Sequence, residues 1–163
     1  MTNNTDESGD ERFSLENCLP YRLATVTDRV SRVFAEHFAH TYDLTIAEWR
    51  VLAVVAEHET LSPTVVGLHT CMDKVKVSRA SRNLVSKGLL RQSMDPRDGR
   101  GRLLRLTRKG NTTHAGMVPL VNRVEQELFG ELNRGEIATL NRILGKISTR
   151  LEMNGLGEES EAA

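Results

Sequence analysis

Apolar residues recur at helical spacing near the beginning of the chain. One stripe predicts a first helix over residues 19–40, in which Pro20 suits the first turn. The members of this stripe are Leu23, Val26, Val30, Val33 and Phe38. Such a stripe has to be buried against another element or another molecule.

Signals for helix starts define the next two helices. Thr45 followed by Glu48 is a capping box, and it predicts a helix to about His58 that is apolar on most sides and therefore buried. Ser62 before Pro63 is a second start, an N-cap followed by proline at the first helical position. It predicts a short helix to about residue 71.

A fourth helix and a hairpin follow. Asp73 caps the fourth helix, which ends near Lys87 with Gly88 as the residue after it. The period then changes, because residues 89–92 and 102–106 have the character of short strands. Turn residues fill the segment between them, so the two strands are predicted to pair as a hairpin.

Two further helices complete the predicted chain. Thr107 begins a long helix in which Pro119 introduces a kink. Asn133 and Glu136 form another cap pair, and the helix after them carries apolar residues in 3-4-3-4 steps, as a coiled-coil seam does. The seam consists of Ile137, Leu140, Leu144, Ile147 and Leu151.

This order of elements predicts a mainly α fold of the α+β winged-helix type, with six helices and a two-stranded β-hairpin wing. We assign residues 43–107 to a winged helix-turn-helix domain. Residues 19–42 and 108–153 are predicted dimerisation helices, because the small central domain cannot cover their stripes and a second copy in a two-fold dimer can. Residues 1–18 and 154–163 are acidic and polar, and we expect flexible ends.

Composition excludes several classes of protein. The 163 residues include no apolar run near the ~20 that a membrane span needs, and the acidic N-terminus resembles neither a signal nor a transit peptide. We therefore expect a cytoplasmic protein with no membrane partner. The two cysteines lack metal spacing, and the chain has no phosphate loop, no His-Glu-x-x-His and no nucleophile elbow. We expect no enzyme activity, no metal site and no cofactor.

The charge is unevenly distributed although the chain is neutral. Residues 74–109 hold twelve Lys or Arg and two Asp, a net charge of +10, whereas the rest of the chain carries −10. A basic segment of this size in a neutral protein predicts a site for a polyanion, and the winged helix-turn-helix domain is expected to bind double-stranded DNA. The alternative is a solvated basic face with no partner.

The predicted helix over residues 73–87 divides into two faces. The side expected to face the core carries Val77, Leu84 and Val85, with Ala80 or Ser81. The residues expected to contact DNA in the major groove are Lys74, Val75, Lys76, Ser78, Arg79, Arg82 and Asn83. Arg79 and Arg82 are the candidates for reading bases, because arginine donates two hydrogen bonds to guanine. Phosphate contacts are expected from Lys74, Lys76 and Lys87.

The hairpin tip adds a second basic element. Arg97, Arg100 and Arg102 lie there beside two glycines, which allow close approach of the backbone. An arginine on such a tip fits the narrow, strongly negative minor groove. Asp95 is expected to hold one of these arginines in position through an ion pair. The alternative is an ordinary charged turn.

These segments resemble the MarR (multiple antibiotic resistance regulator) family over about residues 19–151. The resemblance rests on Leu-Thr-Ile-Ala-Glu-Trp-Arg-Val-Leu at 44–52, Met-Asp-Lys and Val-Ser-Arg within 72–79, and Lys-Gly-Leu at 87–89. It continues in the wing pattern Asp-x-Arg-x-x-Arg, which begins at Asp95, and in Leu-Thr-x-x-Gly at 106–110.

The resemblance implies a triangular homodimer built from the first and last helices, with a winged domain on each side. Family members often repress operons and release palindromic DNA when a small molecule binds. By the matched wing motif, Arg97 resembles the minor-groove arginine, and Asp95 or Arg100 its orienting partner. We therefore expect a ligand-responsive transcriptional repressor.

The resemblance also implies an effector pocket where the dimerisation helices meet the winged domain. Aromatic acids and their CoA thioesters are common effectors in the family, and an anion needs a cationic or donor group near apolar walls. The candidates in this chain are Tyr21, His37, Tyr42, Trp49 and Arg50. Alternatively, Trp49 belongs to the core and His37 is a surface or capping residue.

Two other functions stay open at the level of sequence. Peroxide-sensing members of the family carry a reactive cysteine near the start of the first helix, and Cys18 lies close by, two residues before the matching position at Pro20. A redox-sensing regulator switched through Cys18 is therefore one alternative, and an inert thiol is the simpler interpretation. A winged-helix module that binds a protein and no DNA is the other, and the salt dependence of DNA binding separates it from a DNA-binding regulator.

Overall fold

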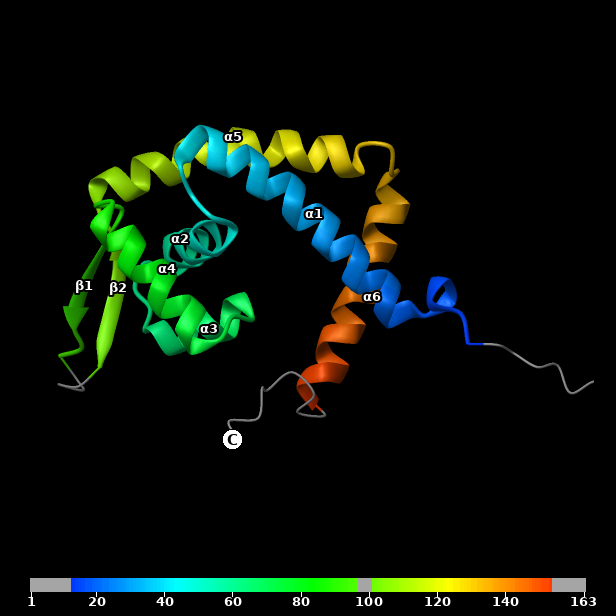
Figure 1. Ribbon diagram of the computed structural model, residues 1–163, viewed down its shortest axis with the longest axis horizontal. Helices are drawn as coiled ribbons and strands as arrows, with labels where there is room; N and C mark the ends of the chain where they lie inside the picture. Colours follow the sequence, from blue (N-terminus) through cyan, green and yellow to red (C-terminus); the bar gives the residue numbers. More distant parts are fainter. Residues whose placement is uncertain (1–12, 97–100, 154–163) are drawn as a thin grey trace, which may run out of the picture.

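Residues 13–96 and 101–153 are described in the computed structural model, and they form six α-helices, one 3-10 turn and a two-stranded sheet (Figure 1). In chain order these are η1 (Leu15–Asn17), α1 (Leu19–Tyr42), α2 (Ile46–His58), α3 (Pro63–Thr70), α4 (Lys74–Ser86), β1 (Leu90–Met94), β2 (Arg102–Leu106), α5 (Arg108–Phe129) and α6 (Arg134–Met153). The expected mainly α architecture with a hairpin wing is confirmed. The first helix extends to Tyr42, two residues beyond its expected end.

The helix starts follow from capping residues. Thr45 and Glu48 form the expected capping box: the Glu48 amide donates to Thr45 Oγ1 at 3.2 Å, and the Thr45 amide donates to Glu48 Oε2 at 2.8 Å. The side chains of Ser62, Asp73 and Thr107 accept from the amide three residues further on, and each begins its helix as predicted.

The start of α6 has the same origin. Asn133 Oδ1 accepts from the amides of Gly135 and Glu136, and the Asn133 amide donates to Glu136 Oε2 at 2.8 Å. This reciprocal pair satisfies amides that the first turn of a helix leaves open. Pro119 lies inside α5, as the sequence predicted, and it removes one helical hydrogen bond there.

The core lies among α2, α3, α4 and the hairpin, together with the end of α1 and the middle of α5. α2 supplies Val51, Leu52 and Val55, all fully buried. Phe38, near the end of α1, and Met117 of α5 are also buried in this core. The carboxyl-terminal half of α1 is therefore part of the core, whereas Leu23 and Val26 of its predicted stripe are exposed.

The hairpin pairs antiparallel, with Leu90 opposite Leu106 and Met94 opposite Arg102. Gly88 has the positive φ of 71° expected of the residue that ends α4, a conformation for which glycine is suited. An isolated β-bridge that the sequence did not predict joins Leu61 to β2. Leu61 exchanges backbone hydrogen bonds with Leu104 at 3.2 and 2.8 Å. The wing is thereby fastened to the turn between α2 and α3.

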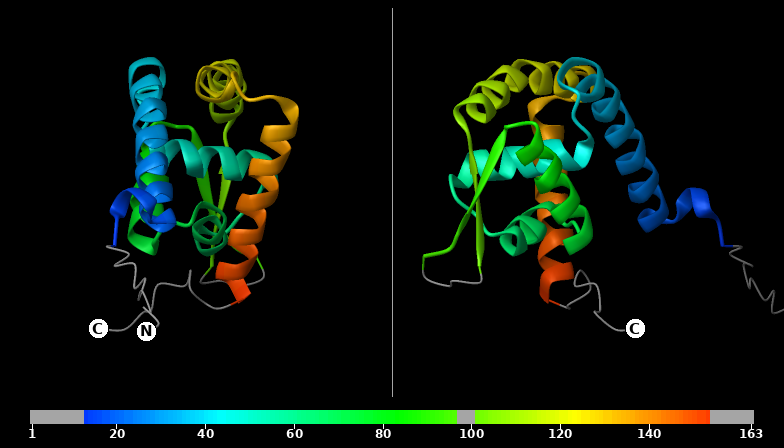
Figure 2. Two further views of the ribbon diagram at one scale, coloured as in Figure 1. Left: turned by 90° about the vertical axis from the view of Figure 1, so that its right-hand side faces the viewer. Right: turned by 60° about the vertical axis from the view of Figure 1, so that its left-hand side comes forward.

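The two ends of the chain project away from this core. α6 leaves the far end of α5 and extends apart from α1, and the two views in Figure 2 agree on this separation. None of the residues of α6 is buried. The exposed apolar side chains of the two end regions are Phe13, Leu15, Leu19, Leu23 and Val26, and Leu140, Ile143, Leu144, Ile147, Leu151 and Met153.

Within residues 13–96 and 101–153, no helix combines the length and the apolar character that crossing a membrane requires.

Candidate nucleic-acid interface

α4 begins at a charged cap. Asp73 Oδ1 accepts from the Lys76 amide at 2.7 Å, and the Lys76 ammonium lies 3.0 Å from Asp73 Oδ2. The hydrogen bond from the Lys76 amide, assisted by the Lys76 ammonium, holds the pKa of Asp73 below its ordinary value. Asp73 is therefore ionised at neutral pH, and it stabilises the positive end of the helix dipole.

The two faces of α4 are well separated. Val77, Ala80, Ser81 and Leu84 are buried, so the helix packs along that side. Val85, which the sequence placed on the same side, is 38% exposed instead, because it lies at the border of the packed face. The seven residues predicted to contact DNA are all exposed, and they are Lys74, Val75, Lys76, Ser78, Arg79, Arg82 and Asn83.

The two candidate base-reading arginines differ in their local contacts. Arg82 Nε donates to the Ser78 carbonyl one turn earlier, at 3.4 Å. Arg79 has no hydrogen bond or ion pair to any residue in the part of the chain that the structure describes. Arg79 therefore has its donors available for an external acceptor such as a guanine edge.

The outer end of the wing is described on both sides of its tip. The Asp95 amide donates to the Gly101 carbonyl at 2.9 Å, which extends the hairpin beyond β1 and β2. Asp95 is half-buried, and Arg102 is exposed. Arg97 and Arg100, the remaining two wing candidates, lie outside the described residues.

Lys87, at the end of α4, differs from the sequence expectation. Its ammonium lies 3.3 Å from Glu48 Oε2 and donates to the Asp43 carbonyl, so it is directed into the protein. From the sequence alone, Lys87 is expected to contact a phosphate. No local signal would have separated it from Lys74 or Lys76, since its partners lie about forty residues earlier in the chain.

The candidate effector residues fall into two places. Trp49 stacks on Phe34 and Phe38 with ring centroids 5.4 and 5.0 Å apart, as part of the aromatic packing between α1 and α2. Tyr42 donates its hydroxyl to the Gly116 carbonyl of α5. Tyr21 lies near the other end of α1, about 30 Å away at ~1.5 Å per residue. One protomer therefore does not bring Tyr21 to the other candidates.

The remaining effector candidates lie near the junction of the helices. His37 Nε2 is 3.9 Å from Glu127 Oε2 of α5, and Arg50 of α2 is half-buried. Tyr21 borders a shallow depression on α1 together with Arg29 and Arg32. This depression is separate from the junction at which His37 and Arg50 lie.

Metal-binding side chains do not cluster in the part of the chain that the structure describes. Among residues 13–96 and 101–153, no group of three His, Cys, Asp or Glu side chains has a metal-binding arrangement. Cys18 and Cys71 are both free thiols, half-buried and exposed respectively. The redox function suggested for Cys18 stays a prediction.

Comparison with known proteins shows which family the chain resembles. Residues 42–101 match the family model described as "MarR family". The multiple antibiotic resistance protein MarR of Escherichia coli strain K12 is 28% identical over 123 residues, which cover 75% of this chain and 85% of that protein. A solved structure of a mutant E. coli MarR with operator DNA superimposes with a TM-score of 0.72 at 28% identity, covering 79% of this chain and 92% of the other. The chain is therefore similar to the MarR family, by the family model over its winged region and by relatives over most of its length.

Two other known proteins show how far the similarity extends. The HTH-type transcriptional repressor IacR of Pseudomonas putida is 26% identical over 147 residues, covering 90% of this chain and 87% of IacR. The structure of Bordetella bronchiseptica BpsR, described in terms of regulation of DNA binding by 6-hydroxynicotinic acid, has a TM-score of 0.77 at 27% identity, with 84% of this chain and 97% of that chain covered. These relatives are transcriptional regulators, which confirms the expectation of a winged-helix transcription regulator and not an enzyme.

Proposed function

We propose that this protein is a MarR-family regulator that binds palindromic double-stranded DNA as a homodimer, represses transcription, and releases the DNA when a small aromatic acid or its CoA thioester binds. The observation that carries the proposal is the outer face of α4. Seven predicted contact residues are exposed there. They stand beside the wing, within a segment of net charge +10 in a neutral chain.

Each part of that face has a role in the proposal. Arg79 and Arg82 read bases in the major groove, Asn83 pairs with adenine, and Lys74 and Lys76 contact phosphates. In the wing, Arg97 enters the minor groove while Asp95, Arg100 and Arg102 orient or support it. The E. coli MarR structure with operator DNA, which is similar over 79% of this chain, supports this arrangement.

The exposed apolar surfaces support the dimer. Leu140, Leu144, Ile147 and Leu151 recur on one face of α6, and all are more than a third exposed in a single protomer. Leu19, Leu23 and Val26 leave a second apolar stripe on the free half of α1. A second copy related by a two-fold axis covers both stripes and gives two α4 helices to one palindromic site.

The effector belongs to the same proposal at the junction of α1, α2 and α5. Trp49 and Tyr42 supply aromatic walls, and His37 and Arg50 supply groups that can hold a carboxylate. Tyr21 reaches this junction only if the partner protomer contributes it. BpsR, whose DNA binding is regulated by 6-hydroxynicotinic acid, supports the aromatic-acid class. The repressor role is supported by the similarity to the repressor IacR.

Salt-dependent DNA binding tests the core of the proposal. The full chain is titrated by fluorescence anisotropy against a duplex recovered from a random pool and against the same duplex with its sequence shuffled. A dimeric regulator binds the recovered duplex more tightly, and its affinity falls linearly on a log–log plot against salt. Failure to bind either duplex in dilute buffer would contradict DNA binding and favour a protein-interaction module.

A ligand screen tests the effector. 6-Hydroxynicotinic acid, benzoic acid and benzoyl-CoA are compared by the shift each causes in the thermal midpoint of the protein. An effector raises the midpoint and releases the bound duplex over the same concentration range. Peroxide that releases the duplex from the wild type and not from Cys18→Ser would support the redox alternative instead.

A further inference from the structure

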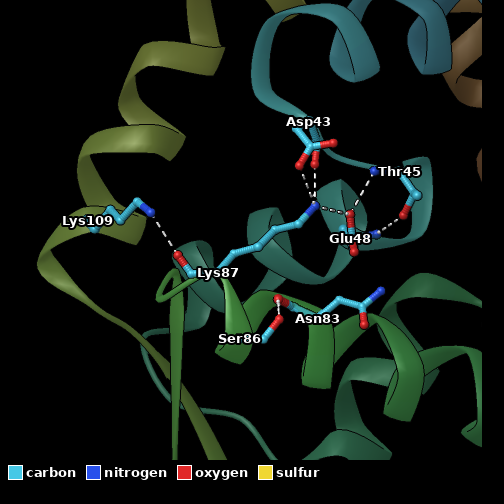
Figure 3. A network of polar contacts seen from close by, with 7 residues as sticks. All are labelled: Asp43, Thr45, Glu48, Asn83, Ser86, Lys87 and Lys109. Carbon is cyan, nitrogen blue, oxygen red and sulfur yellow. Dashed lines mark hydrogen bonds and ion pairs between the residues drawn. The ribbon is translucent and has the colours of Figure 1, made fainter.

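The carboxyl-terminal end of α4 is held by a polar network that joins it to neighbouring helices (Figure 3). The Lys87 ammonium donates to the Asp43 carbonyl, and it lies 3.3 Å from Glu48 Oε2 and 3.5 Å from Asp43 Oδ2. Its side chain is 30% exposed, in contrast to the exposed Lys74 on the same helix. Lys87 therefore joins α4 to the corner between α1 and α2.

Glu48 requires a charged partner because its carboxylate is buried. Its side chain is 3% exposed, and the carboxylate also accepts from the Thr45 amide at 2.8 Å. A buried carboxylate is unfavourable unless it is paired and hydrogen-bonded. Lys87 supplies the paired cation, so the position of Lys87 and the capping box of α2 depend on each other.

A second set of bonds holds the same end of α4 from the other side. The Lys109 ammonium of α5 donates to the Lys87 carbonyl at 2.8 Å. Thr107 Oγ1 donates to the Gly88 carbonyl at 2.6 Å. The end of α4 is thus fastened both to the α1–α2 corner and to the start of α5. Both α1 and α5 belong to the predicted dimerisation helices.

We propose that Lys87 is a positioning residue for sequence-specific DNA recognition, which sets the angle of α4 through Glu48 and Asp43 and does not contact a phosphate. The proposal rests on the proposed DNA binding by α4. Two half-sites of a palindrome are read together only when both α4 helices have a fixed orientation relative to the dimer axis. A loosened α4 still presents its positive charge, so binding that ignores sequence persists while specific binding is lost.

The Lys87→Met and Glu48→Gln variants give this proposal a distinctive test. Removing the negative charge of Glu48 from a DNA-binding domain would tighten binding if charge alone mattered. If Lys87 and Glu48 instead position α4, Glu48→Gln should weaken binding to the specific duplex. The partner variants should also be non-additive, because either one breaks the same contact.

The experiment compares the full chain with Lys87→Met, Glu48→Gln, the double variant and the matched control Lys74→Met. Each is titrated against the recovered duplex and its shuffled version over a salt series, well below its thermal midpoint. We expect Lys87→Met and Glu48→Gln to weaken binding to the recovered duplex at least about tenfold. The affinity for the shuffled duplex and the slope of affinity against salt should stay unchanged. Lys74→Met should weaken binding to both duplexes and reduce the magnitude of the log–log salt slope by about 0.9.

The outcomes separate the alternatives. A slope reduced by about 0.9 in Lys87→Met, with equal losses on both duplexes, would make Lys87 a phosphate contact and overturn the proposal. Tighter specific binding by Glu48→Gln would overturn it as well. If Lys87→Met does not fold, the double variant, which leaves no unpaired buried charge, carries the same comparison. Absence of binding by the wild-type chain would instead contradict the proposed function.

Discussion

Gly110, in the first turn of α5, lies directly against the carbonyl group of Leu89. A Cβ atom at position 110 would come within 2.0 Å of the Leu89 carbonyl oxygen and 2.9 Å of a Leu106 methyl group. Only glycine permits this approach, which brings the start of α5 against the base of the hairpin. The Leu89 carbonyl also accepts from the Thr107 amide at 3.0 Å, so the contact is part of the bonded joint between wing and helix.

Gly110→Ala should therefore destabilise the protein by about 1–3 kcal/mol or more, because backbone atoms have to move to admit the methyl group. Chemical denaturation of the full chain measures this change. Gly145→Ala in α6 is the matched control, since a Cβ atom there meets nothing within 4 Å in a protomer. The control should be neutral or stabilise by about 0.5–1 kcal/mol through helix propensity. Equal effects of the two variants would contradict the close approach.

Ser81 offers a stabilising substitution inside α4. Its Oγ atom is buried and finds no hydrogen-bond partner among the described residues. Replacing the hydroxyl in Ser81→Ala removes a buried unsatisfied polar group, so the free energy of unfolding should rise by about 1 kcal/mol. Ser86→Ala is the control, because Ser86 is exposed and its hydroxyl donates to the Asn83 carbonyl. A loss of stability in Ser81→Ala would show that this hydroxyl has a partner.

Arg79 tests the reading of bases by α4. Arg79→Ala should cost about 1–3 kcal/mol of affinity for the preferred duplex and relax the preference at one base pair in each half-site. Lys76→Ala, on the same exposed face, should weaken all sequences alike. Affinities for a set of single-base operator variants distinguish the two patterns. A uniform loss in Arg79→Ala would make Arg79 a phosphate contact.

The apolar face of α6 tests the dimer. Leu144→Asp should weaken self-association at least about tenfold, because a charge in an apolar interface costs more than ~1.4 kcal/mol. Thr149→Asp introduces the same charge away from this face and should leave the dimer intact. Deletion of residues 133–163 should also yield monomers with poor DNA affinity. Light scattering measures the mass, and a dimeric Leu144→Asp variant would place the interface elsewhere.

The cap of α4 should respond to acid in a predictable direction. The pKa of Asp73 lies below its ordinary value of 3.8, so its ionised form stabilises the folded state above that pH. This contribution is lost as the pH falls through the lowered pKa. Asp73→Asn keeps a capping acceptor but does not titrate. The difference in thermal midpoint between wild type and Asp73→Asn should therefore shrink between pH 7 and pH 3, and a constant difference would argue against the charged cap.

Much of this fold could be predicted from local signals. The capping box of Thr45 and Glu48, the Asp73 cap and the Gly88 stop each involve residues within a few positions of one another. The helix starts and ends that they produce can therefore be predicted from the sequence. The pairing of Leu61 with Leu104 was not predictable in this way, because a single residue in a turn carries no periodic pattern.

The sequence by itself determined the helices, the wing and the basic outer face of α4, since helical period, capping and charge act over short stretches of chain. The tertiary structure decided what each polar group on those elements is used for. Lys87 and Lys74 have the same chemistry, and only the fold brings Lys87 to Glu48 and Asp43. A buried carboxylate selects its cation through proximity in space, and that proximity arises when distant segments pack.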